Sequence, residues 1–202
     1  MVNSGDVIWD VYHVDIEKRK FVIGFISCSL LVSILLKDNS VDFIYFQIER
    51  LRVVSRLRAD SDILMRIAHR LLVEQINTET LLRSYKEHHD ILQLLEDIST
   101  DVKLVLDFII DLKRLKQLNL MTISDEHIAF TALTRRAEII LRVTMNIKVF
   151  SKLEPADVHI DCLLGTVKEE DIRMLIKNVK RDHRFLRRYI SDVRDYIYLM
   201  EN

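Results

Sequence analysis

The sequence has very little of the two residues that chains use to turn sharply. It contains three glycines and one proline in 202 residues, and residues 25–154 contain neither. Tight turns between strands commonly need glycine for a positive φ or proline for a fixed one, whereas helices reverse direction far less often. The scarcity therefore predicts an all-α fold: a single domain over residues 1–202, built as an antiparallel bundle of six to eight helices.

The chain also lacks an excess of charge of one sign. Thirty Lys and Arg stand against 31 Asp and Glu, which gives a formal net charge of −1. Dedicated nucleic-acid binders usually carry a clear basic excess, so a nucleic-acid partner is not expected. Near-neutral charge gives little repulsion between copies, which is compatible with a homo-oligomer.

Cysteine is scarce as well, since Cys28 and Cys162 are the only two. Two cysteines in a long apolar chain do not make a disulfide framework. Their apolar neighbours predict buried free thiols in a reducing compartment, and hence a cytoplasmic protein. A bridge between the two is the alternative.

Motifs that would identify an enzyme are missing. Three isolated glycines cannot build a P-loop, a G-x-G-x-x-G fingerprint or a G-x-S-x-G elbow, and neither E-x-x-H nor H-E-x-x-H occurs. We therefore expect no enzyme, no cofactor and no metal. The cluster over residues 87–90 (EHHD) is interpreted as a solvated helical face. A thiolate pair of Cys162 with His159 is the one catalytic alternative, although nothing in the sequence supplies an oxyanion hole.

One uncharged apolar run stands out, residues 21–36, preceded by Lys18, Arg19 and Lys20. As a helix it would measure about 24 Å, shorter than the roughly 30 Å core of a bilayer. We expect a buried helix at the centre of the bundle. The alternative is a peripheral, membrane-associated protein that inserts this run and places the three cations at acidic lipid head groups.

Elsewhere apolar residues recur at steps of three and four, which predicts amphipathic helices. The predicted helices cover residues 43–57, 62–98, 104–115, 124–150, a short one from Pro155 to Gly165, and 166 to nearly the C-terminus. The first twenty residues are predicted to form a helix, although Tyr12, Val14 and Ile16 also alternate as a strand would.

The predicted last helix carries a basic stripe. Between residues 177 and 188 the only acid is Asp182, and the cations are Lys177, Lys180, Arg181, Arg184, Arg187 and Arg188. Arginine forks onto carboxylates and phosphates, so this stripe is a candidate partner-binding surface. The alternative is a solvated face.

The composition is rich in Ile, Asp and Arg with only six Ala. In this it is similar to small helical host-interaction proteins of viruses, including Bcl-2-like members, although the NWGR-type signature of that family is absent. The similarity implies an all-helical protein that binds other proteins. The leading hypothesis is thus a non-enzymatic helical protein–protein interaction module, which binds through a groove between helices or through the basic stripe. Lipid binding and the Cys162 enzyme are the competing hypotheses.

Overall fold

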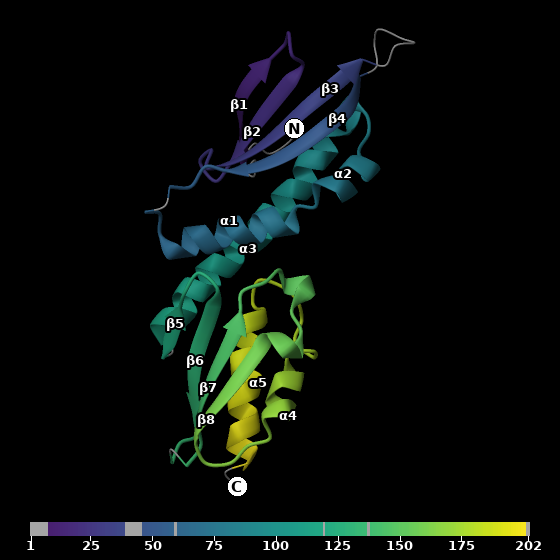
Figure 1. The fold of residues 1–202 in the computed structure, drawn as a ribbon. Coiled ribbons are helices and arrows are strands. Elements are labelled where there is room, and N and C mark those ends of the chain that lie inside the picture. The colour runs from purple at the N-terminus through teal and green to yellow at the C-terminus, as the bar shows by residue number, and fades with distance from the viewer. Residues whose placement is uncertain (1–7, 39–45, 59, 119, 137, 201–202) are drawn as a thin grey trace, which may run out of the picture. The chain divides into compact units, whose positions relative to one another are not determined.

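The chain folds into two compact units, each built around its own β-sheet (Figure 1). The computed structural model describes residues 8–38, 46–58, 60–118, 120–136 and 138–200. The first unit comprises Met1–Ser61 and His69–Lys103, and the second comprises Asp62–Ala68 and Leu104–Asn202. Helices α1 (Ile63–Gln75) and α3 (Ile91–Leu118) each contribute residues to both units.

The first unit holds a four-stranded antiparallel sheet in the order β1-β2-β3-β4. Its strands are β1 (Trp9–Asp15), β2 (Lys20–Phe25), β3 (Leu30–Asp38) and β4 (Phe46–Ser55). The helix α2 (Thr78–Ser84) and the 3₁₀ turn η1 (His88–Asp90) also belong to this unit. Side chains from the inner face of the sheet pack in a core with residues of α1 and α3. Members of this core are Phe25, Leu30, Val32, Ile34, Leu71, Leu72, Leu94 and Ile98.

The second unit repeats the meander, in the order β5-β6-β7-β8. Its strands are β5 (Met121–Ile123), β6 (His127–Leu133), β7 (Ile140–Asn146) and β8 (Val158–Leu164), with η2 (Phe150–Lys152) and η3 (Pro155–Asp157) before β8. Helices α4 (Glu169–Leu175) and α5 (Phe185–Met200) follow. In its core, Phe108 stacks on Phe185 with ring centroids 5.3 Å apart, and Phe130 meets Tyr189 edge to face at 6.3 Å.

The predicted all-α bundle is therefore wrong, and the protein is a mixed α/β fold with two antiparallel sheets. An all-helical Bcl-2-like fold is inconsistent with these sheets for the same reason. The prediction failed because it assumed that hairpin turns require glycine or proline. The β2–β3 turn instead places Ile26, Ser27 and Cys28 at φ of 52°, 53° and 61°, and the β1–β2 turn places Arg19 at 50°. Non-glycine residues reach this left-handed region at a cost of roughly 1–2 kcal/mol each, so few glycines do not exclude hairpins.

The apolar run 21–36 is a β-hairpin and not a buried helix. It comprises most of β2, its turn and most of β3. Phe25 pairs with Leu30 and Ile23 with Val32, and all four side chains are buried on the inner face. Apolar residues such as Val22 and Leu35 occupy the outer face too, and they hide the two-residue period that would have marked a strand. Among the described residues, no helix has both the length and the apolar character needed to cross a membrane.

Four more predicted helices contain strands. The described part of residues 1–20 contains β1, and residues 155–165 contain η3 and β8. The segment 43–57 contains β4, although Phe43 and Ile44 lie outside the described residues, and the segment 124–150 contains β6 and β7. In β4 the register slips where Leu35 and Leu36 pair with Arg50 and Ile48. This irregularity puts the buried residues Ile48 and Leu51 three positions apart, which imitates a helical step.

The remaining helical predictions are correct in part. The segment 104–115 lies within α3, as expected, whereas residues 62–98 divide into α1, α2, η1 and the beginning of α3. The predicted last helix consists of α4 and α5 with residues 176–184 outside any helix.

Candidate functional site

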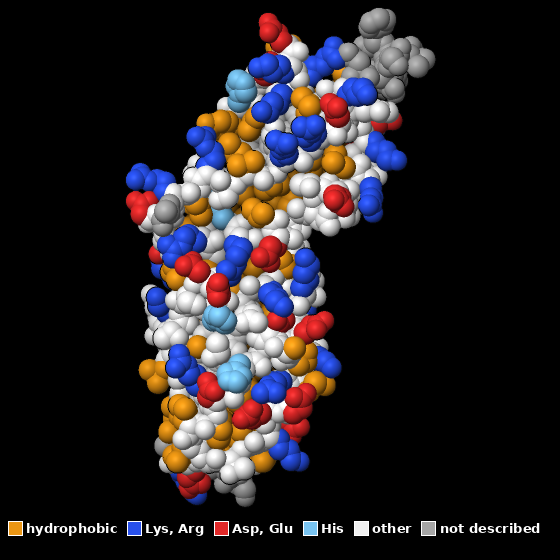
Figure 2. Space-filling model, in the orientation of Figure 1, with side chains coloured by type: hydrophobic (Ala, Val, Ile, Leu, Met, Phe, Trp, Pro, Cys, Tyr) orange, Lys and Arg blue, Asp and Glu red, His pale blue; other side chains and the backbone are white. Residues whose placement is uncertain are grey.

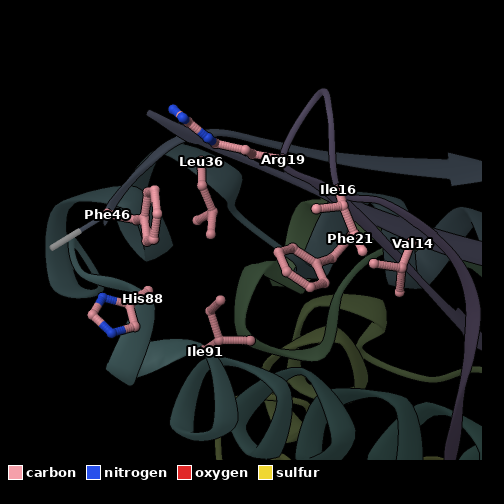
Figure 3. A pocket seen from close by; sticks show the side chains of 8 residues that line it. All are labelled: Val14, Ile16, Arg19, Phe21, Leu36, Phe46, His88 and Ile91. Carbon is pink, nitrogen blue, oxygen red and sulfur yellow. The ribbon is translucent and has the colours of Figure 1, made fainter. Parts of the chain in front are cut away.

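The first unit contains an apolar hollow of about 540 Å³ (Figure 3). Hydrophobic side chains supply most of its lining, and the polar side chains are one arginine and one histidine. The lining residues are Val14, Ile16, Arg19, Phe21, Leu36, Phe46, His88 and Ile91. Figure 3 shows Phe46 and His88 on one side of the empty space and Phe21 across from them, with Ile91 beneath. The hollow thus lies where the inner face of the sheet meets η1 and the start of α3.

Strand register brings the sheet residues of the hollow together. Val14 of β1 pairs with Phe21 of β2, and Phe21 in turn pairs with Ile34 of β3, so the three side chains share the inner face. Ile23 and Phe25, farther along this face, are buried, and so is Ile34 beside Phe21. The hollow is therefore continuous with the hydrophobic core, at an end that the described helices leave open.

Hydrogen bonds hold the opposite wall of the hollow in place. The side-chain carboxylate of Asp90 accepts hydrogen bonds from the backbone N–H groups of Lys86 and Glu87, both at 3.0 Å, and these bonds cap η1. The bond to Glu87 holds the pKa of the Asp90 carboxyl below its ordinary value. The N–H of Ile48 donates to the carbonyl of Lys86 at 2.7 Å, which ties this wall to β4. The hollow is thus bounded by fixed elements on both sides.

The rim of the hollow exposes apolar surface. Ile16 is 85% exposed and Val14 is 43% exposed. The side chain of Arg19 passes above Leu36 toward Phe46, with its guanidinium 5.2 Å from the centroid of the phenyl ring (Figure 3). Phe46 also meets the ring of His88 edge to face at 6.1 Å. This lining suits apolar groups of a ligand and offers no set of acid, base and nucleophile.

Strand β1 beside the hollow forms one edge of the sheet. It pairs with β2 and with no other strand among the described residues. Val11 and Tyr12 on this strand are 60% and 47% exposed. A strand with one unpaired side presents backbone N–H and C=O groups that a further strand can use. The hollow and this edge therefore adjoin one another.

Two smaller hollows lie on the outer face of the sheet in the second unit, with volumes of about 460 and 340 Å³. They share Thr122, Ala129 and Arg142, and their linings are mixtures of small, hydroxyl-bearing and apolar residues. Ala129 of β6 is buried beneath both hollows, and the buried Met121 and Phe130 also line the larger one.

The structure does not assemble the predicted basic stripe on one helix. Lys177, Lys180, Arg181 and Arg184 lie between α4 and α5, and Arg187 and Arg188 lie in the first turn of α5.

Most of these cations already have protein partners. Arg187 pairs with the buried Asp111. Arg188 donates to Asp182 at 2.7 Å, and this contact lowers the pKa of the Asp182 carboxyl to about 2. Lys180 lies 3.7 Å from the same carboxylate, and Arg181 donates to the carbonyl of Leu153 at 3.1 Å. Within the described part of the chain, Lys177 and Arg184 are the two of these six cations whose side chains form no hydrogen bond or ion pair.

The cations predicted to flank a membrane segment lie in the β1–β2 turn. Lys18 pairs with Asp15 at 3.5 Å, Arg19 lies over Phe46, and Lys20 begins β2. The apolar side chains that follow them are largely buried in the sheet core.

The candidate catalytic pair is not assembled. His159 lies 3.0 Å from Asp161, whereas the Cys162 thiol donates to the carbonyls of Leu164 and Gly165. Both Cys28 and Cys162 are free thiols, but they are half-buried where full burial was expected. Across the described ranges, no three His, Cys, Asp or Glu side chains come together in a way that could hold a metal ion.

One histidine that the sequence analysis passed over is buried. His69 on α1 is 3% exposed, and its two ring nitrogens lie 3.0 Å from the Ser29 hydroxyl and 2.9 Å from the Ser55 hydroxyl. Burial lowers the pKa of its imidazole. The arrangement ties the β2–β3 turn and the end of β4 to α1.

Sequence reasoning missed the hollow because its residues are scattered from position 14 to position 91. The alternation of Tyr12, Val14 and Ile16 was a usable signal for an exposed strand.

Comparison with known proteins assigns the chain to no family. No family model matches it, and no curated protein shows significant similarity to it.

Proposed function

We propose that the protein is a non-enzymatic protein-binding module whose first unit receives an extended apolar segment of a partner. The observation that supports this proposal is the open, apolar end of the core beside an edge strand. Apolar side chains of the partner enter the hollow, and its backbone pairs with β1.

Burial of apolar surface provides the driving force. Removing apolar surface from water contributes about 25 cal/mol per Å². Ile16 and Val14 expose such surface at the rim, next to the half-buried Phe21. Strand addition supplies backbone hydrogen bonds that depend little on sequence, whereas the hollow selects the side chains that fit it. The partner segment would therefore carry branched or aromatic residues at alternate positions.

The competing hypotheses have less support. The run 21–36 was expected to insert into lipid, yet Phe25, Leu30 and Ile34 within it are fully buried in the folded chain. An enzyme based on Cys162 would need His159 to activate the thiol, and these groups have other partners.

Site-specific photocrosslinking tests the proposal. A photoreactive phenylalanine analogue replaces Ile16 in one variant and Val73 in a control, since Val73 is 47% exposed on α1 and does not line the hollow. Each variant is crosslinked in an extract of its native source, and the attached peptides are identified by mass spectrometry. The expected result is one recurring apolar segment at position 16 that is absent at position 73.

The second arm of the test introduces a negative charge at position 16 and, as the control, at position 73. Ile16→Asp should abolish capture of that segment, whereas Val73→Asp should leave it unchanged, with both variants showing the wild-type circular dichroism spectrum. Equal crosslinking at both positions, or capture that survives Ile16→Asp, would contradict the proposal.

A further inference from the structure

A second surface of the first unit lies on the outer face of the same sheet, away from the helices. Three cations surround a hollow of about 130 Å³ there, together with a hydroxyl group and an apolar floor. The residues are Lys20, Ser33, Leu35, Arg50 and Arg52. In Figure 2, Lys and Arg side chains gather around hydrophobic ones over this part of the molecule.

The pairing of the strands explains why these side chains converge. Lys20 of β2 pairs with Leu35 of β3, and Leu35 pairs with Arg50 of β4, so the two cations flank Leu35 in one row. In the next row Ser33 pairs with Arg52. Adjacent strands lie about 4.8 Å apart, and alternate residues of one strand lie about 7 Å apart. Long Lys and Arg side chains from these positions can reach one common point above Ser33.

No carboxylate of the described residues forms an ion pair with the three cations. Within the described residues, Lys20, Arg50 and Arg52 form no ion pair, and all three are exposed. The nearest acid by register is Asp15, which pairs with Lys20 across the sheet but is held by Lys18 at 3.5 Å. Glu49 precedes Arg50 at the irregularity of β4. The three cations converge on one hollow, so an anion bound there reduces their mutual repulsion and gains free energy from it.

We propose that this basic hollow binds a phosphorylated side chain of a partner protein. A phosphomonoester carries a charge of about −1.5 to −2 at pH 7 and three acceptor oxygens. Two guanidinium forks, one ammonium and one hydroxyl match this charge and these acceptors better than they match a singly charged carboxylate.

The surroundings favour a protein over a nucleic acid or a membrane. Val54, 47% exposed, and the half-buried Leu31 continue the outer face beside the hollow, and such apolar surface can pack against residues that flank a phosphorylated one. A nucleic-acid backbone needs cations spaced along a track together with stacking rings. Here the cations converge, and Tyr12 is already engaged by Arg56, whose guanidinium lies 5.4 Å from the centre of its ring.

The inference is independent of the hollow on the inner face, so the two proposals can fail separately. Its test uses the full chain, labelled with ¹⁵N, and four probes. The probes are a peptide with a central phosphoserine, the same peptide with serine, vesicles containing a phosphoinositide, and a single-stranded oligonucleotide. Binding is measured by NMR shifts of the backbone amides and by fluorescence anisotropy.

The expected result is saturable binding of the phosphopeptide, with shifts centred on residues 20, 33, 50 and 52. Its affinity should exceed that of the serine peptide by roughly ten-fold or more, since a single charge-assisted hydrogen bond is enough to account for about this difference. The double variant Arg50→Glu/Arg52→Glu should lose this preference. The matched control Lys177→Glu/Arg184→Glu changes the net charge by the same amount in the second unit and should retain it.

Three outcomes would overturn the inference. The first is equal affinity for the two peptides. The second is loss of binding in the Lys177/Arg184 control with retention in the Arg50/Arg52 variant, which would locate the site among the cations before α5. The third is tighter binding of the vesicles or the oligonucleotide than of the phosphopeptide, which would assign the basic hollow to a membrane or a nucleic acid instead.

Discussion

The two units use the same plan, a four-stranded antiparallel meander followed by helices, but they complete their cores differently. In the second unit, α5 buries Phe185, Leu186, Tyr189, Ile190, Val193 and Ile197 along one face. The hydroxyl of Tyr189 donates to the carbonyl of Ile172 at 3.0 Å, which ties α5 to α4. In the first unit the core ends at an open apolar hollow beside β1. A completed core gives stability, and an incomplete one leaves surface that another molecule can bury.

The largest effect should come from opening the completed core. Phe185→Ala removes a ring that stacks on Phe108 and is 2% exposed. It should lower the free energy of unfolding by about 3–5 kcal/mol, measured by urea denaturation. Ile16→Ala at the rim of the first unit's hollow should change it by less than about 0.5 kcal/mol. Similar losses for the two variants would break the contrast between the units.

An ion pair of the second unit gives the next effect. Arg187→Ala leaves the carboxylate of Asp111, which is 5% exposed, without its guanidinium partner. We expect a loss of about 2–3 kcal/mol by urea denaturation, somewhat below the value for a fully buried pair because Arg187 is half exposed. Arg184→Ala is the matched control, and it should cost less than about 0.5 kcal/mol. Equal losses in the free energy of unfolding for the two variants would indicate that Arg187 is part of a solvated basic surface.

Acid should affect the units at different pH values. Arg188 lowers the pKa of Asp182 from 3.8 to about 2, so folding favours the ionised carboxylate. The stabilisation is present above about pH 4 and is lost as the pH falls toward 2, by up to about 2 kcal/mol. Asp182→Asn should remove this part of the acid sensitivity.

In the first unit, burial lowers the pKa of His69, so folding favours its neutral imidazole. That contribution is present above about pH 6.5 and declines as the pH falls below it. Urea denaturation at a series of pH values checks both effects. A His69→Gln variant with unchanged sensitivity between pH 7 and 5 would contradict the assignment to His69.

The smallest effect concerns the strained β2–β3 turn. Cys28 has a φ of 61°, and its thiol lies where a Cβ at Gly24 would come within 2.5 Å. Cys28→Gly relieves the left-handed strain and should stabilise the protein by about 0.5–1 kcal/mol, after the entropic cost of the new glycine. Gly24→Ala should destabilise it by thermal or urea denaturation, because the added methyl group meets Cys28. A neutral Gly24→Ala would contradict close packing of Cys28 against Gly24.

The errors of sequence reasoning have specific physical causes. A strand with apolar residues on both faces, such as β3, hides the period of two in its sequence, and a bulged strand, such as β4, shows a false period of three. The helix α3 was predictable within residues 104–115 because its apolar stripe is regular and long. The basic residues from Lys177 to Arg188 were recognised as a charge cluster, but the pairing of Arg187 with Asp111 depends on where a distant segment folds.

The candidate sites also differ in whether a local sequence pattern could have predicted them. The exposure of β1 had a local signal in Tyr12, Val14 and Ile16. The basic hollow combines Lys20 with Arg50 and Arg52, which are thirty positions apart in the chain, and strand register alone brings them together.

By itself, the sequence determined which residues would seek burial, where helices with regular stripes could begin, and that no familiar catalytic motif is present. Those properties depend on neighbours within a few positions, because hydrophobicity, capping and motif chemistry act locally. Only the tertiary structure decided that residues 21–36 form a hairpin, that one core is closed and the other open, and which cations remain without partners. Those outcomes depend on pairing between distant segments, and the free energy that decides such pairing comes from contacts that no local pattern contains.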